Sequence, residues 1–78
     1  MEEKLKSVMA NVLGAKSDEI NDDSSMQTLM NWDSLKHMEL MMAIEDEFEM
    51  PELSMDEIVE MTSFSKIKSI LKSKGVEI

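Results

Sequence analysis

Cysteine is absent from this 78-residue sequence, which excludes disulfide bonds and zinc sites built on cysteine. A long apolar run is also missing. The opening stretch MEEKLKSVMANVLG mixes charged and apolar residues, unlike a signal peptide or a membrane span. Both absences are typical of proteins of the reducing cytoplasm. We therefore predict a cytoplasmic protein that does not insert into membranes.

Basic residues are scarce. Eight Lys and Arg residues stand against 17 Asp and Glu residues, and the formal net charge at pH 7 is −9. Nucleic acids and anionic membranes bind basic surfaces, so we expect neither as a partner and predict partner proteins with basic faces. The acidic stretch DEINDDSS lacks the spacing, the central glycine and the terminal glutamate of a calcium-binding EF-hand. No metal site is predicted.

Aromatic residues are few, namely Trp32, Phe48 and Phe64, whereas methionines number ten. The core must therefore be aliphatic and rich in methionine, whose flexible side chain fills irregular gaps and could also yield to an inserted apolar chain. We expect a single domain over residues 1–78. A core of this size supplies roughly 3–5 kcal/mol of net stability, which favours a monomeric carrier or binding module over an enzyme with a deep active site.

The first helix is predicted over residues 2–13, because apolar residues recur there at helical spacing and Gly14 stands where a left-handed residue would end the helix. Residues 14–32 show no periodicity and form a long loop, which in so small a domain is usually functional. Four apolar side chains are expected to hold this loop against the core: Ile20, Met26, Leu29 and Met30.

Three further helices are predicted over residues 34–49, residues 55 to about 61, and from residue 64 to Gly75. Residues suited to helix caps and helix ends mark their boundaries: Asp33, Pro51, Ser54 with Glu57, and Ser63. Leu53 and Ile58 would pack together across the start of the third helix. The buried stripe of the fourth helix is expected to consist of Phe64, Ile67, Ile70 and Leu71. The predicted fold is all-α, a four-helix bundle with a short third helix.

The second predicted helix carries apolar residues on two sides. Its core face is expected to contain His37, Leu40, Met41, Ile44 and Phe48. The opposite side mixes apolar and acidic residues: Leu35, Met38, Glu39, Met42, Glu45, Asp46 and Glu49. Scattered exposed apolar residues are normal, but these crowd near one serine and are ringed by acids. We interpret the mixed side as a docking surface.

Ser34, at the start of that helix, has three interpretations. It is an ordinary helix-start residue, a nucleophile, or a site of modification. As a nucleophile it needs a base, but His37, the only histidine, projects toward the core with no evident residue to orient it. We therefore predict no catalytic residue. A phosphodiester on the serine oxygen would instead lie at a helix N-terminus, where backbone N–H groups and the helix dipole favour an anion.

Around Ser34 the chain resembles the acyl carrier protein family, which includes the carrier domains of polyketide and nonribosomal peptide synthesis. Asp33-Ser34-Leu35 matches the family's D-S-L signature, and HMELMMAIEDEF resembles its recognition helix. The tripeptide alone is weakly specific, but the match extends over nearly the whole acidic, helical chain, including the long first loop and the short third helix.

By this resemblance, a separate phosphopantetheinyl transferase would transfer 4′-phosphopantetheine from coenzyme A to Ser34, between Asp33 and Leu35. The thiol of this arm would carry acyl or aminoacyl groups as thioesters in fatty acid, lipid, polyketide or related biosynthesis. Basic surfaces of partner enzymes would meet Leu35, Met38, Glu39, Met42, Glu45 and Asp46. An apolar cavity for the cargo would be lined or bordered by Met26, Met30, Met41, Ile44, Ile58 and Met61.

Three positions depart from the family's pattern. Asn31 stands where glycine is common, and asparagine can adopt the left-handed backbone that glycine would supply. Trp32 stands where a small or apolar residue is usual, and we expect it to pack over the loop or beside the arm. Lys36 places a positive charge where many fatty-acid carriers have an acid. Together the three departures favour a specialised free-standing carrier over the housekeeping fatty-acid carrier.

A different class of protein stays open. An acidic, methionine-rich helical module without catalytic activity could bind partner helices in its grooves. Modification of Ser34 distinguishes this module from a carrier.

Overall fold

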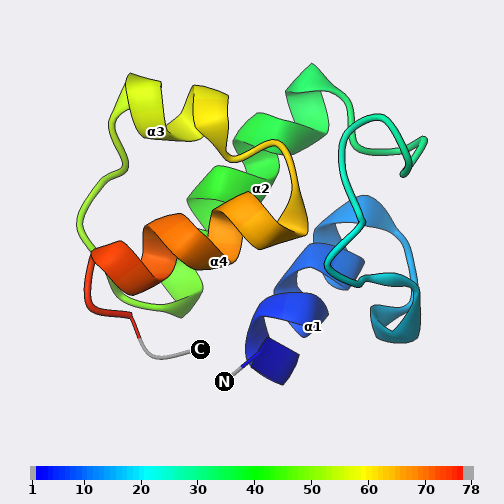
Figure 1. The fold of residues 1–78 in the computed structure, drawn as a ribbon, viewed down its shortest axis with the longest axis horizontal. Coiled ribbons are helices and arrows are strands. Elements are labelled where there is room, and N and C mark those ends of the chain that lie inside the picture. The colour runs from blue at the N-terminus through cyan, green and yellow to red at the C-terminus, as the bar shows by residue number, and fades with distance from the viewer. Residues whose placement is uncertain (1, 77–78) are drawn as a thin grey trace.

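The computed structural model describes residues 2–76. Within that range the helices are α1 (Glu2–Leu13), the short 3-10 helix η1 (Ser17–Glu19), α2 (Ser34–Glu47), α3 (Met55–Glu60) and α4 (Phe64–Ser73). The predicted all-α fold with a short third helix is confirmed. Figure 1 shows the long loop between α1 and α2 at one end of the bundle. None of the described helices has the length and apolar character needed to cross a membrane.

The predicted bounds of α1 and the predicted starts of α3 and α4 are confirmed, whereas α3 ends at Glu60 and α4 ends at Ser73, two residues before Gly75. Gly14 has a φ of 67° after α1, a left-handed conformation that favours glycine. Ser54 and Glu57 form the predicted capping box of α3, each side chain accepting a hydrogen bond from the other residue's backbone N–H. Ser63 caps α4 by accepting the N–H of Lys66 at 3.2 Å.

The end of α2 differs from the prediction. The helix stops at Glu47 rather than at residue 49, because the chain folds into a capping turn before it reaches Pro51. Glu49 takes a left-handed conformation with a φ of 48°, and the Met50 N–H donates to the Glu45 carbonyl at 3.2 Å. This six-to-one hydrogen bond is the usual closure of a helix C-terminus.

The long loop is more ordered than its sequence suggests. It contains η1, and it pairs with the segment before α4 through the Met26 N–H on the Thr62 carbonyl and the Phe64 N–H on the Ser24 carbonyl. Ile20 is buried as predicted, and Met26 and Leu29 pack against the core.

The expectation that Met30 holds the loop to the core is wrong, because its side chain is 97% exposed. Trp32, only 1% exposed, occupies the core instead. An indole buries more apolar surface than a thioether chain, so the stretch that contains both residues gains more by turning the tryptophan inward.

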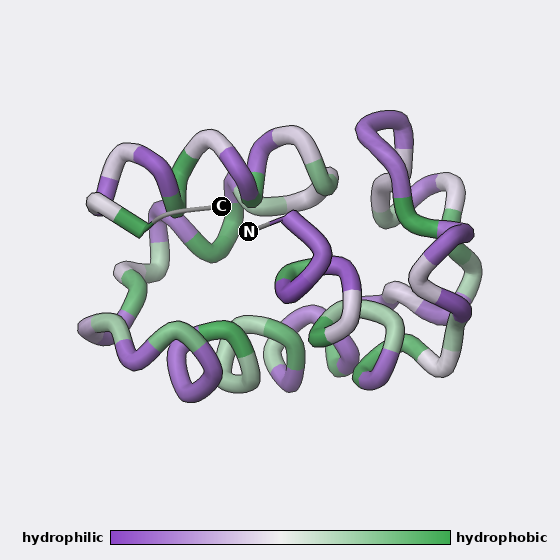
Figure 2. Tube along the Cα trace, turned by 90° about the horizontal axis from the view of Figure 1, so that it is seen from below, coloured by the Kyte–Doolittle hydropathy of each residue, from purple (hydrophilic) through white to green (hydrophobic). Residues whose placement is uncertain are grey.

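The core combines aliphatic, methionine and aromatic side chains from α1, α2, α4 and the connecting segments, and Ile58 of α3 packs against its border. Figure 2 shows hydrophobic and hydrophilic residues alternating along the helices, as expected for elements with one buried face. Phe48 and Ile70, both predicted to be buried, are only partly so. Phe48 lies just beyond the end of α2, and Ile70 lies at the edge of the stripe formed by Ile67 and Leu71.

Lys68 on α4 joins the start of α1 to the loop. Its ammonium group donates to the carboxylates of Glu2, at 2.6 Å, and Asp22, and it lies 4.9 Å from the ring centroid of Phe64. The hydrogen bonds from Lys68 lower the pKa of both carboxyl groups, and the bonds to Asp22 and then Glu2 raise the pKa of Lys68. Neutralising any of these three groups therefore weakens the stabilisation that the cluster gives to the fold.

Replacing Lys68 with Met keeps an apolar stem over Phe64 and removes the charge. We expect a lower free energy of unfolding at neutral pH. The pKa values of Glu2 and Asp22 fall below their ordinary 4.5 and 3.8 in the folded state, so the stability that they contribute is present above those values. That contribution, and with it the deficit of the variant, disappears as pH falls through the lowered values. It also disappears as pH rises through the raised pKa of Lys68, above 10.5.

Urea unfolding of both proteins over a pH series measures this difference. A deficit of the same size at neutral pH and in strong acid would contradict the proposed role of the cluster.

Candidate functional site

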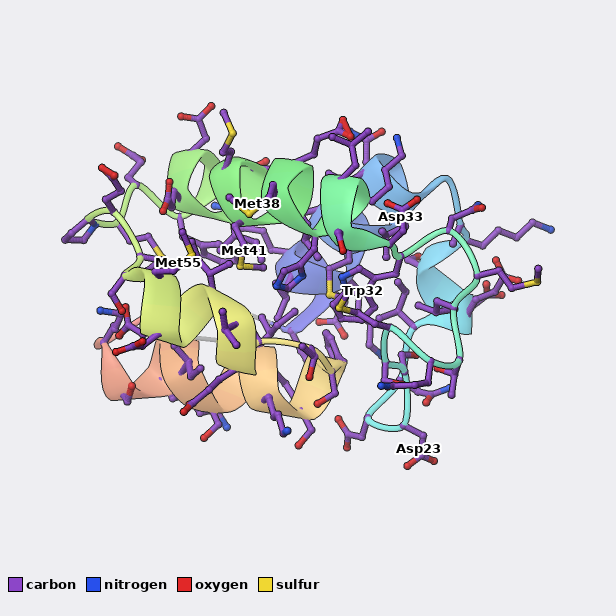
Figure 3. The ribbon with its side chains drawn as sticks, turned by 90° about the horizontal axis from the view of Figure 1, so that it is seen from above. Asp23, Trp32, Asp33, Met38, Met41 and Met55 are labelled. Atoms are coloured by element: carbon purple, nitrogen blue, oxygen red, sulfur yellow. The ribbon has the colours of Figure 1, made fainter. Side chains whose placement is uncertain are left out.

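Ser34 is the first residue of α2, and its side chain is exposed. Asp33 caps the helix as predicted: its backbone is extended, and its carboxylate accepts the Lys36 N–H at 2.9 Å. The His37 N–H then donates to the Asp33 carbonyl at 2.8 Å, which closes the first turn. Figure 3 shows Asp33 at the start of α2, with Trp32 between the helix and the loop.

The start of α2 is chemically suited to hold an anion on the Ser34 oxygen. The first N–H groups of a helix have no carbonyl partner within the helix, and the helix dipole adds partial positive charge there. Asp33 occupies one of these groups, the N–H of Lys36. A phosphodiester on Ser34 would therefore lie beside backbone donors in solvent, with no need to open the core.

A buried chain of hydrogen bonds runs behind Ser34. The Trp32 indole Nε1–H donates to His37 Nδ1 at 3.0 Å, and His37 Nε2 lies 2.7 Å from the Ile58 carbonyl oxygen. Because Nδ1 accepts, the imidazole is neutral and its proton lies on Nε2, which donates to Ile58. Trp32 and His37 are 1% and 7% exposed.

This arrangement removes the interpretation of Ser34 and His37 as a nucleophile and its base, because both ring nitrogens of His37 already have partners. Sequence reasoning placed His37 on the core face correctly but missed its bond to Trp32. The sequence did carry a signal for this bond. Trp32 and His37 are the only tryptophan and the only histidine, and they lie on either side of Ser34 in the sequence. Each ring has a polar atom that needs a hydrogen-bond partner when it is buried.

Asn31 does not adopt the left-handed backbone that was expected of it. Among the described residues other than glycine, only Glu49 has a positive φ. Instead, the side-chain amide of Asn31 donates to the Leu13 carbonyl at 3.1 Å. Asparagine here ties the loop to the end of α1 by covering one of the carbonyls that a helix leaves unpaired at its C-terminus.

The short helix α3 is held to α2 at both ends. His37 donates to the Ile58 carbonyl near the end of α3, and the Glu45 carboxylate accepts the Leu53 N–H at 2.7 Å just before its start. Glu45, predicted for the docking surface, thus also has a structural bond and is partly buried. Its role in docking stays a prediction.

A third contact links α3 to α4. The Lys74 ammonium lies 2.8 Å from the Glu57 carboxylate. Its hydrogen bond is the main cause of the lowered pKa of Glu57.

An exposed apolar surface spans α2 and α3. On α2, Leu35, Met38 and Met42 are exposed as predicted, together with Glu39 and Asp46. On α3, Met55 and Val59 are 66% and 65% exposed, and sequence reasoning did not include them. We call these seven residues the α2–α3 face. The hydrogen bonds of Glu45 and His37 keep its two helices together.

The residues predicted to surround a cargo cavity divide into three groups. Met41, Ile44 and Met61 are at most 1% exposed within the core, whereas Met26 and Ile58 pack at its border. Met30 does not belong with them, because it lies on the surface. A cavity that opens for cargo among the remaining five stays a prediction.

The family model described as phosphopantetheine attachment site matches residues 3–71. The match runs from α1 to α4 and includes Ser34 and the α2–α3 face.

Replacing Asp33 with Ala removes the cap of α2. We expect the free energy of unfolding to fall by about 1 kcal/mol, because the Lys36 N–H loses its acceptor. Urea unfolding measures this, with Asp33→Asn expected to retain most of the stability. The matched control is Asp23→Ala in the exposed loop, which should unfold like the wild type. Equal stability of Asp33→Ala and wild type would mean that α2 does not depend on this cap.

Proposed function

Since the chain belongs to the phosphopantetheine attachment site family, we propose that Ser34 carries the 4′-phosphopantetheine group and that the protein presents acyl or aminoacyl groups on it to partner enzymes. Domains of this family hold the group covalently, and they act as carriers. The observation that supports Ser34 is its exposed hydroxyl at the capped start of α2, within the D-S-L signature.

The loading reaction requires a second protein. A phosphopantetheinyl transferase would bind coenzyme A and the start of α2 together. The Ser34 oxygen forms a bond to phosphorus as the pyrophosphate bond of coenzyme A breaks, and adenosine 3′,5′-bisphosphate leaves. The hydroxyl proton passes to a base of the transferase, because both ring nitrogens of His37 are occupied.

The residues of this chain present the site and do not carry out the chemistry. Asp33 fixes the first turn of α2, and the backbone N–H groups there stabilise negative charge on the Ser34 oxygen. When bound, the group supplies a terminal thiol, which is the atom suited to thioester chemistry. The protein is therefore proposed to be a carrier without catalytic activity of its own.

The α2–α3 face supports the docking of partner enzymes. It places five exposed apolar side chains together with Glu39 and Asp46. These residues lie on α2, which begins at Ser34, and on α3, which is joined to α2 by the buried hydrogen bond of His37. With a net charge of −9, the protein attracts enzymes that have basic surfaces, and this attraction accelerates encounter. The apolar residues then provide contact area.

Incubating the protein with coenzyme A and a broad-specificity phosphopantetheinyl transferase tests the attachment site. We expect the mass of one phosphopantetheine to be added to the wild type and nothing to Ser34→Ala, which lacks the accepting oxygen. Ser65→Ala, an equivalent change at another exposed helix serine, should be loaded normally. Intact mass spectrometry gives the result, and circular dichroism checks the fold of each variant.

A folded wild-type protein that several competent transferases leave unmodified would overturn this function. The acidic interaction module would then be favoured.

Reversing an acid on the α2–α3 face tests the docking role. We expect Glu39→Lys and Asp46→Lys each to slow association with a transferase on the order of tenfold at low salt, because electrostatic steering is weakened. Stability should change little at these exposed sites. Glu3→Lys on α1 makes the same charge change away from the face. If all three variants are loaded at equal rates, the face does not guide the transferase.

A further inference from the structure

Trp32 and His37 connect three parts of the chain through one imidazole ring. The Trp32 N–H closes a turn on the Leu29 carbonyl at 3.0 Å, and its side chain donates to His37 on α2. The other ring nitrogen donates to Ile58 on α3. Trp32 directly precedes Asp33, the N-cap of α2. The position of the indole therefore constrains the backbone that leads into Ser34.

This chain of hydrogen bonds works only with a neutral imidazole. Protonation would add a hydrogen at Nδ1, which then faces the indole N–H, and two donors would oppose each other at 3.0 Å. The buried indole N–H would lose its acceptor. Leaving a buried donor unpaired disfavours the closed arrangement by roughly fivefold to a hundredfold. The hydrogen bond to the Ile58 carbonyl needs only the proton on Nε2, so it survives protonation of the ring. Of the two partners of His37, Trp32 is therefore the one that is released.

The charged groups around the ring are engaged elsewhere or exposed. On α2, Asp33 caps the helix, and on α3, Glu57 pairs with Lys74 while Glu60 is exposed. The buried side chains of α1 and α4 are all apolar. Among residues 2–76, the ion pairs are formed by lysines, and none involves His37. An added proton on the imidazole would therefore join none of these ion pairs.

We propose that His37 is a positioning residue that holds Ser34 ready for loading through Trp32, and that protonation of the imidazole releases Trp32 and lowers the loading rate. The positioning of Ser34 for transfer rests on the proposed function, whereas the release of Trp32 does not. Of the three partners only the imidazole can gain a proton, so the device would respond to acidification.

The wild-type protein allows a direct spectroscopic test, because it contains one tryptophan and one histidine. The ring protons of His37 in the NMR spectrum follow its protonation, and the emission wavelength and acrylamide quenching of Trp32 follow its exposure. We expect Trp32 emission to move to longer wavelength and its quenching to rise with the same midpoint as the histidine titration. Helix content by circular dichroism should stay constant through that transition.

Two spectroscopic results would overturn the release of Trp32. One is an indole that stays buried while His37 titrates. The other is an indole that becomes exposed only when the helices unfold.

Loading rates across pH test the positioning role. In His37→Gln the side-chain amide can still accept from the Trp32 indole and donate to the Ile58 carbonyl, but it has no group that gains a proton in acid. We expect wild type and His37→Gln to be loaded at similar rates at mildly alkaline pH. The ratio of wild-type to variant rate should then fall through the His37 midpoint, because protonation lowers the population of the closed wild-type protein. Using this ratio cancels the pH dependence of the transferase.

Trp32→Phe provides a second test that does not depend on how glutamine packs. It keeps an aromatic ring but has no N–H to oppose the protonated imidazole, so its loading should decline less in acid than that of the wild type. A wild type that declines in parallel with both variants refutes the positioning role of His37 while leaving the carrier function intact. Absence of loading at every pH would instead refute the carrier function.

Discussion

The hydrogen bond from the Trp32 indole to His37 is the contact on which the surroundings of Ser34 depend. His37 Nδ1 accepts the hydrogen bond from the end of the loop, and His37 Nε2 holds α3 through the Ile58 carbonyl. Within residues 2–76, no buried side-chain nitrogen or oxygen lacks a partner. Because an unpaired buried group costs about 1–3 kcal/mol, breaking either hydrogen bond of this chain disfavours the closed arrangement around the start of α2.

Local signals made most of the fold predictable. The bounds of α1, the caps at Asp33, Ser54 and Ser63, and the left-handed Gly14 all follow from residues within one helical turn of the feature they create. The position of Ser34 at the start of α2 was predictable for the same reason, since Asp33 before it is a suitable N-cap. These features depend on short-range hydrogen bonds, whose geometry varies little between proteins.

Features that depend on contacts between distant residues were not predictable. Without periodicity in the loop, the sequence does not show which of Met30 and Trp32 faces the core, and only the packed structure shows that the indole is buried and the methionine is exposed. The bond of Glu45 to the Leu53 N–H and the pairing of Lys68 with Glu2 have no signal in the sequence, because any of several acids and lysines could have met. Their partners are chosen by how the helices pack.

The exposed side of α2 has an apolar content that the stability of the fold does not require. Leu40, Met41 and Ile44 already bury one side of the helix, whereas Leu35 and Met42 gain little by facing water. Methionine is well suited to such a surface, because its flexible thioether chain adapts to partners of different shape. The same residue type therefore fills the core at Met41 and remains available for contact at Met42. One apolar side of α2 packs in the core, and in the proposed carrier function the other side contacts successive partners.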